Sequence, residues 1–144
     1  MMLRELTAGV PGARVSSRAA DVDIDAVVYR SDLVAPGTIF ACLRGLQADG
    51  HDFAPQAVAA GAGALIVERE LPLDIPQMVV VDSRLAMALV AGRLAGDPSS
   101  RLTVVGVTGT NGKTTCAFLL RAVLEAAGRP CGLIGTIEAR VGGR

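Results

Sequence analysis

Residues 104–128 read VVGVTGTNGKTTCAFLLRAVLEAAG. An apolar, β-branched run precedes a glycine-containing loop, and apolar residues at helical spacing follow the loop. This order predicts a strand at 102–107, a loop at 108–112 and a helix at 113–127. Glycines let a loop backbone approach an anion without a Cβ in the way, and the amides that open the helix point at it. The stretch therefore predicts a phosphate-binding corner of an α/β domain.

The loop resembles the general phosphate-loop pattern G-x-x-x-x-G-K-[ST], with one departure. The pattern expects glycine at position 107, where this chain has Val107 between Gly106 and Gly109. Lys113 follows the last glycine of the loop and is placed to contact the β- and γ-phosphates of a nucleotide. The alternative is an ordinary strand–turn–helix corner with a surface lysine. The apolar strand before the loop and the amphipathic helix after it favour the phosphate site.

Strand and helix patterns also alternate upstream of this loop. Short apolar runs bounded by proline and glycine predict strands, and apolar residues at helical spacing predict helices between them. The expected strands are 24–30, 37–43, 64–68 and 77–82. The expected helices are one that begins at 53 and ends at Gly61 or Gly63, and one at 83–96. Asp82 or Ser83 is expected to cap the second helix, and Gly96 to end it. This alternation is typical of an α/β layer fold.

The segment GDPSSR at 96–101 interrupts the alternation and predicts a domain boundary. The expected domains are 1–98 and 99–144. A strand at 131–136 completes one strand–helix–strand unit in the second domain. Because a single such unit cannot bury both faces of a sheet, we expect the second domain to be truncated.

Composition sets limits on function. Of the 144 residues, 51% are hydrophobic, and 14 basic residues balance 14 acidic ones, so no nucleic-acid-binding surface is expected. No apolar run approaches the roughly 20 residues that cross a bilayer, and the N-terminus lacks a signal-peptide pattern. Three cysteines flanked by apolar residues, Cys42, Cys116 and Cys131, predict buried free thiols in a reducing cytoplasm.

The string GVTGTNGKTT at 106–115 resembles the ATP-binding loop of the Mur ligases, the amide-bond synthetases of peptidoglycan precursors. Residues 35–68 look like the UDP-binding domain that two members of this family share. One of these members adds the third amino acid of the peptide stem, diaminopimelate or lysine, and GLIGTIEARVGG at 132–143 is similar to it. The other adds D-Ala-D-Ala and is the alternative. A third possibility, in another class, is a nucleotide- or UDP-sugar-binding module without catalysis.

The resemblance implies an α/β fold, in which a UDP-binding domain precedes the start of an ATPase domain. It implies ATP and Mg²⁺ as cofactors, small-molecule substrates, a cytoplasmic enzyme and an acyl-phosphate intermediate. Lys113 would act in catalysis and the hydroxyl of Thr114 would bind Mg²⁺. The ATP-binding residues would be Gly109, Thr110, Asn111, Gly112, Lys113, Thr114 and Thr115. Residues 1–144 alone are expected to lack ligase turnover, because the family's remaining catalytic groups follow this segment.

The resemblance also implies contacts with the UDP part of the substrate. The family commonly has Asp-Ser-Arg where this chain has Arg30-Ser31-Asp32, so the role of the serine passes to Ser31. Tyr29 stands where the family usually has a small or aliphatic contact residue, and that role passes to it. In the loop 45–50, the contacts would come from Leu46, Gln47 and Ala48. The alternatives are a serine that caps a turn and a plain turn at 45–50.

Two polar features are assigned structural roles. His51, the only histidine, has no nucleophile or metal-ligand partner nearby in the sequence and is expected to hydrogen-bond a loop to a helix. Asp21, Asp23 and Asp25 alternate with apolar residues and are expected to form a solvated strand edge rather than a cation site.

Overall fold

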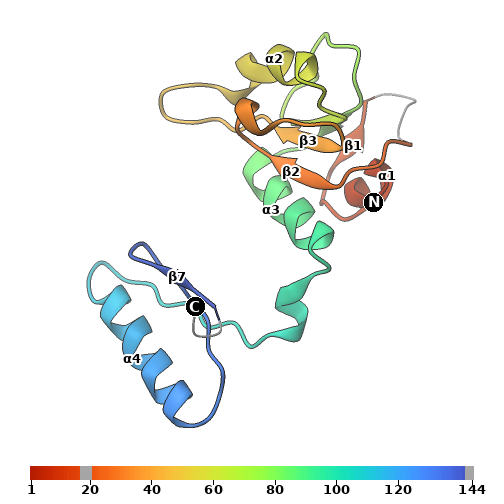
Figure 1. Ribbon diagram of the computed structural model, residues 1–144. Helices are drawn as coiled ribbons and strands as arrows, with labels where there is room; N and C mark the ends of the chain where they lie inside the picture. The colour runs from red at the N-terminus through yellow and green to blue at the C-terminus, as the bar shows by residue number, and fades with distance from the viewer. Residues whose placement is uncertain (17–20, 142–144) are drawn as a thin grey trace. The chain divides into compact units, whose positions relative to one another are not determined.

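The computed structural model describes residues 1–16 and 21–141. The chain divides into two compact units, Met1–Leu102 and Thr103–Arg144. Figure 1 shows the helices and strands of each unit. The division lies directly after the proline- and serine-containing segment 96–101, which ends in a short 3-10 helix, η3, at Pro98–Arg101.

Unit 1 contains a five-stranded sheet in the order β1-β5-β4-β3-β2. Its strands are β1 (Arg14–Val15), β2 (Ala26–Val28), β3 (Thr38–Ala41), β4 (Ala64–Val67) and β5 (Gln77–Val79). Strands β2 to β5 are parallel, and β1 pairs antiparallel with β5 at one edge. The predicted α/β fold class is therefore confirmed, and all four predicted strands of this unit are present, although each is shorter than expected.

The helices of unit 1 follow the predicted order. They are α1 (Leu3–Ala8), α2 (Ala54–Ala59) and α3 (Ser83–Leu94), with short 3-10 helices η1 (Ser31–Leu33) and η2 (Gly50–Phe53). Asp82 caps α3, since its carboxylate accepts hydrogen bonds from the Arg84 and Leu85 amides at 2.9 Å. Helix α1 and strand β1 were not predicted, because neither is long enough to show a clear hydrophobic period.

The sheet is buried on both faces, which explains its continuous apolar strands. Ile39 and Ala41 of β3 point into a core with α1 and α3. Phe40 and Cys42 alternate with them and point into a second core with α2. Burial raises the pKa of the Cys42 thiol to about 12, with nearby Asp49 adding to the effect, so this cysteine is the buried free thiol that was predicted.

Because β2, β3, β4 and β5 are parallel, their carboxyl ends lie at one edge of the sheet. The segments that leave this edge are 29–34, 42–50, 68–71 and 80–83. Ligands of open parallel sheets usually bind at this edge, and all five predicted UDP-contact residues lie in the first two of these segments.

The three alternating aspartates lie before β2, and their side chains are exposed as predicted. Asp21 accepts a hydrogen bond from Arg4 Nη1 at 2.8 Å. Asp23 lies 3.6 Å from the N-terminal amine and pairs with Met2 in an isolated bridge. These two carboxylates hold the N-terminal segment.

Unit 2 consists of α4 (Lys113–Ala126) and a hairpin of β6 (Leu133–Ile134) and β7 (Ala139–Arg140). The predicted helix is confirmed, but the strand predicted at 102–107 is wrong: residues 103–107 have no regular secondary structure. The strand predicted at 131–136 is reduced to two residues. A strand needs a hydrogen-bonded neighbour, and β6 pairs with β7 rather than with the segment before the loop.

Two of the predicted buried thiols also require correction. Cys116 of α4 is exposed, and Cys131 is partly exposed. Most apolar residues of unit 2 face solvent as well, because Leu133 is the only buried residue among those described in this unit.

Candidate functional site

A small cavity lies where β2 ends. Its volume is about 210 Å³, and its lining consists of Tyr29, Arg30, Ser31, Asp32, Phe40 and Phe53. The structure therefore brings together Tyr29 and Ser31, two of the predicted UDP-contact residues. The cavity adds Phe53 to them, and this residue was missed by the sequence analysis.

Aromatic side chains are concentrated around this cavity. The whole chain has one tyrosine, three phenylalanines and no tryptophan, and all of these except Phe118 line it. Phe40 is buried beneath it, whereas Tyr29 and Phe53 are 58% and 43% exposed. The scarcity of aromatic residues was the signal that could have found Phe53, because so few positions of this chain carry an aromatic ring. Exposed rings of this kind offer flat apolar surfaces on which a heterocyclic base stacks.

Ser31 lies between two charges that neutralise each other. Arg30 donates from Nε and Nη2 to the two carboxylate oxygens of Asp32, at 3.0 and 2.6 Å. This bidentate pair raises the pKa of Arg30 and lowers that of Asp32, mainly through the hydrogen bond itself. The exchanged charges of the Arg30-Ser31-Asp32 triplet thus form an internal ion pair, and the rim of the cavity carries no net charge. Such a rim suits a neutral ring more than a phosphate.

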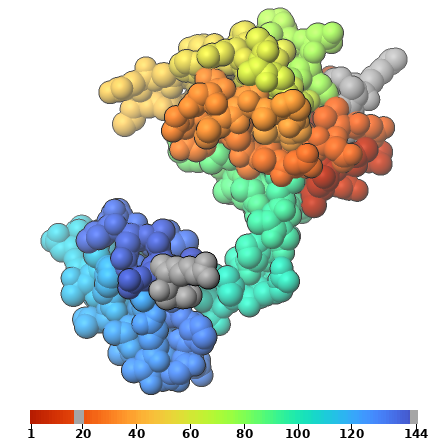
Figure 2. Space-filling view, in the orientation of Figure 1, coloured from red at the N-terminus to blue at the C-terminus, as the bar shows by residue number. Residues whose placement is uncertain are grey.

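Residues 44–49 form a tight turn after β3, which we call the projecting turn. Arg44 and Asp49 pair in an isolated antiparallel bridge, and the Gly45 amide donates to the Ala48 carbonyl at 2.9 Å. Figures 1 and 2 show this orange-yellow segment extending from the body of unit 1. Leu46 at its tip is 107% exposed.

The remaining predicted UDP-contact residues, Leu46, Gln47 and Ala48, lie on this turn and are all exposed. They are not among the residues that line the cavity next to Ser31. Both groups lie beyond the carboxyl ends of neighbouring strands, β2 and β3, so a ligand longer than the cavity is needed to touch both.

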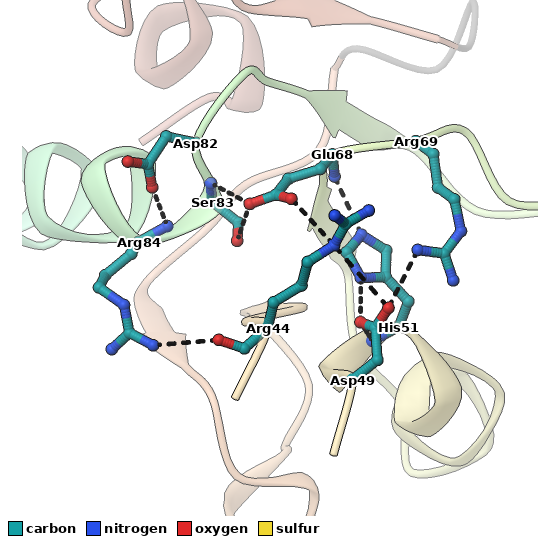
Figure 3. Close-up of polar contacts among 8 residues, drawn as sticks. All are labelled: Arg44, Asp49, His51, Glu68, Arg69, Asp82, Ser83 and Arg84. Atoms are coloured by element: carbon teal, nitrogen blue, oxygen red, sulfur yellow. Dashed lines mark hydrogen bonds and ion pairs between the residues drawn. The ribbon is translucent and has the colours of Figure 1, made fainter. Parts of the chain in front are cut away.

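His51 anchors the base of the turn, in a way that differs from the prediction (Figure 3). Its side chain is fully buried. Its Nδ1 lies 2.5 Å from Asp49 Oδ1, and its Nε2 accepts a hydrogen bond from the Glu68 amide at 3.0 Å. These partners define the tautomer with the proton on Nδ1. The histidine therefore joins the turn to the end of β4, not to a helix, although its structural role is as expected.

The contact between Asp49 and His51 makes the stability of the fold depend on pH. Hydrogen bonds from the His51 amide and then from its ring hold the pKa of Asp49 far below its usual range. The pKa of Asp49 is lower in the folded state than in the unfolded state, so its carboxylate stabilises the fold. This stabilisation is complete above the unfolded-state pKa of about 3.9 and is lost as the pH falls through the folded-state pKa.

We therefore expect the stability gap between the wild-type chain and Asp49→Asn to be widest at neutral pH and to narrow steadily below about pH 4. Urea midpoints measured from pH 7 to pH 2 give this gap directly. A gap that stays constant or widens on acidification would contradict the assignment.

In unit 2, the predicted phosphate loop has the backbone that its glycines were expected to allow. Gly109 has φ of 150° and Gly112 has φ of 76°, both in the left-handed region. Gly112 is the N-cap of α4 and, in the described part of the chain, no side chain caps this helix. The amides of its first turn are thus left to an external acceptor, in contrast to α3, where Asp82 takes that role.

Lys113 folds back over the loop. Its Nζ donates to the Gly109 carbonyl at 2.5 Å and to the Thr110 carbonyl at 3.2 Å. The Lys113 ammonium is therefore held beside the uncapped start of α4. An anion bound there would contact both this cation and the amides of the first helical turn. This arrangement fits the phosphates of a nucleotide.

A second cavity, of about 330 Å³, lies beside this loop within unit 2. Lys113 and Thr114 line it together with apolar residues of α4 and the 131–138 segment. The described residues contain no group of three His, Cys, Asp or Glu side chains that could hold a metal ion. The Thr114 hydroxyl fits Mg²⁺ only as one ligand among phosphate oxygens and waters, which is how Mg²⁺ is usually held.

Comparison with known proteins establishes the family to which this chain belongs. The model of the Mur ligase family, catalytic domain, matches residues 23–95, and that of the Mur ligase middle domain matches residues 107–142. The chain belongs to the Mur ligase family.

Individual relatives show which members of this family the chain is similar to. The UDP-N-acetylmuramoyl-L-alanyl-D-glutamate–2,6-diaminopimelate ligase of Geobacillus thermodenitrificans is 46% identical over the whole chain. A solved structure of a ligase with the same printed name is 25% identical, covers 98% of this chain and 28% of that one, and has a TM-score of 0.76. The MurF ligase of Thermotoga maritima, solved in complex with ADP, is 36% identical, covers 69% of this chain and 23% of that one, and has a TM-score of 0.53. The chain spans 29% of the length of the Geobacillus relative.

One further observation concerns membranes. Among the described residues, none of the helices has both the length and the apolar character needed to cross a bilayer.

Proposed function

We propose that this chain is the substrate- and nucleotide-binding part of an ATP-dependent ligase. That ligase adds diaminopimelate or lysine as the third amino acid to UDP-MurNAc-L-Ala-D-Glu in the cytoplasm. The observation that carries the proposal is the uncapped first turn of α4 beside Lys113, in a member of a family of amide synthetases. In this proposal residues 1–98 bind the UDP precursor, and residues 99–144 begin the ATP-binding domain.

Unit 1 would bind the two ends of a UDP group at two places. The aromatic cavity at Tyr29, Ser31 and Phe53, whose rim carries no net charge, accepts the uracil ring, and the Ser31 hydroxyl is available to the polar edge of that ring. The projecting turn, with Gln47 and its backbone groups, contacts the part of the precursor that extends beyond the cavity. The charge pair of Arg30 and Asp32 frames the ring without attracting phosphate.

Unit 2 would bind ATP. The loop amides and Lys113 neutralise the phosphates, and Thr114 supplies one oxygen ligand to Mg²⁺. Charge moves onto ADP as the γ-phosphoryl group is transferred to the carboxylate of the substrate. Fixed donors around the phosphates stabilise that charge, and the amine then replaces phosphate to form the amide.

The dipeptide-adding member remains the second candidate within the family, since the solved MurF ligase is also similar. The diaminopimelate-adding function is favoured because the Geobacillus ligase of that name is 46% identical over the whole chain. The solved ligase of that name also covers 98% of the chain with a TM-score of 0.76, whereas the MurF structures cover 69–86% of it with TM-scores of 0.53–0.63.

Phe53→Ala tests the uracil site. Removing a stacking ring costs about 1–3 kcal/mol per base, so we expect UDP affinity to fall about 5- to 150-fold. Isothermal titration of the variant with UDP measures this. Phe118→Ala removes the one phenylalanine outside the cavity and should leave UDP affinity unchanged. Equal losses in both variants, or none in Phe53→Ala, would refute the site.

A further inference from the structure

The projecting turn has little of its own to hold it in place. Residues 46–48 at its tip are exposed. Its internal contacts are the Arg44–Asp49 β-bridge, an ion pair of 3.9 Å between the same two residues, and the hydrogen bond between Gly45 and Ala48. Its direction relative to the sheet must therefore be set at its base, where Asp49 is only partly exposed.

Asp49 connects the base of the turn to two other segments. Its Oδ1 accepts from the backbone amide of His51 at 3.0 Å and from the His51 ring. Its Oδ2 accepts from Arg69 Nη1, beyond the end of β4, at 3.1 Å. A carboxylate that accepts this many donors is fixed in one orientation, because rotation of its side chain would break several bonds at once.

His51 and Glu68 extend the connection to the helix that follows β5. The His51 ring accepts from the Glu68 amide, and the Glu68 carboxylate accepts from the amide and the hydroxyl of Ser83 at 3.1 and 2.9 Å. Ser83 is the buried first residue of α3. The turn is thus linked, through a network in which His51 and Ser83 are buried, to the ends of two strands and the start of a helix.

Two arginines form further contacts between this network and the turn (Figure 3). Arg44 Nε lies 3.2 Å from Glu68 Oε2, and Arg84 Nη2 donates to the Arg44 carbonyl at 3.3 Å. The six charged residues balance: Arg44, Arg69 and Arg84 against Asp49, Glu68 and Asp82. A balanced set whose members bind one another offers no net charge to a ligand, so its arrangement suits holding the turn.

We propose that Asp49 and His51 are positioning residues that orient the projecting turn and thereby set its affinity for a nucleoside diphosphate. The proposal rests on the proposed UDP-binding function of this turn. Neither side chain touches the ligand; each acts through the position of residues 46–48. The polar network around Asp49 and His51 thus contributes to UDP binding, although these two residues do not contact the UDP itself.

Asp49→Asn is the first test, with UDP as the probe. The variant keeps the shape of the side chain and loses the charge that Arg69 and His51 share. We expect UDP to bind about tenfold more weakly at a temperature where the variant is fully folded. The matched control is Asp21→Asn, which removes an exposed carboxylate paired with Arg4 at 2.8 Å and should bind UDP as the wild type does. Wild-type affinity in folded Asp49→Asn would overturn the proposal.

Substitutions of His51 supply a graded readout that a general loss of stability does not. In His51→Asn the amide nitrogen can still donate to Asp49 from near the position of Nδ1, whereas His51→Ala loses both contacts. UDP affinity should therefore be highest in the wild type, lower in His51→Asn and lowest in His51→Ala. Equal affinity in the two variants would overturn the role of the Asp49–His51 contact.

Amide hydrogen exchange without ligand separates this proposal from the proposed function. In Asp49→Asn and His51→Ala the amides of Gly45 and Gly50, which close the turn, should exchange faster than in the wild type. Unchanged exchange would overturn the positioning role. Failure of the wild-type chain to bind UDP would instead overturn the UDP assignment, and the exchange rates would still decide whether these residues hold the turn.

Discussion

Lys113→Ala should weaken ATP binding about 100-fold and leave UDP binding unchanged. The lysine supplies a cation beside the uncapped start of α4, and hydrogen bonds to charged partners contribute about 1.5–3 kcal/mol each. UDP affinity should be unaffected because Lys113 belongs to unit 2, whereas the UDP-contact residues belong to unit 1. Isothermal titration with Mg-ATP and then with UDP measures both.

Arg129→Ala is the matched control for this variant. It also removes one cation from unit 2, but at the far end of α4, after the helix has ended at Ala126. It should bind ATP as the wild type does. An equal loss of ATP binding in both variants would mean that overall charge matters rather than the loop. Loss of UDP binding in Lys113→Ala would mean that the change disturbs folding.

Gly50→Ala should destabilise unit 1 by about 3 kcal/mol. A Cβ at this position would lie 2.5 Å from the Leu43 nitrogen and 2.6 Å from its oxygen. Both are backbone atoms, and the Gly50 amide donates to that same oxygen at 2.8 Å. Neither can move without displacing the base of the projecting turn, so UDP affinity should fall as well. Urea unfolding measures the loss of stability.

Gly92→Ala is the control for the effect of an added methyl group. Gly92 lies inside α3, and its Cβ would be 3.6 Å from the nearest atom, Asp97 Oδ1, an ordinary contact. Since alanine favours a helix over glycine by up to about 1 kcal/mol, this variant should be as stable as the wild type or more so. If Gly50→Ala were equally well tolerated, the backbone at the turn would be more adaptable than the close approach indicates.

Local patterns were sufficient to predict most of unit 1. Each parallel strand is a short β-branched run, and Asp82 is a residue type that caps helices, so both followed from the sequence. The elements of unit 2 were predicted less well. Whether 103–107 becomes a strand depends on a pairing partner, and no feature of the segment itself specifies that partner.

The candidate site was predictable where residues adjacent in sequence make it up. The glycines and the lysine of 109–113 lie together, so the loop could be identified directly. Phe53 reaches the cavity only because β2 and β3 lie side by side, and His51 meets Glu68 only because β3 and β4 do. Such contacts depend on sheet order, which a single sequence does not contain.

The most direct test of the account is a titration of the chain with UDP, with Mg-ATP, and with each in the presence of the other. We predict one site for each ligand and no competition between them, because the two sets of residues lie in separate units. Competition between the ligands, or absence of binding by either, would contradict the assignment of UDP to unit 1 and ATP to unit 2.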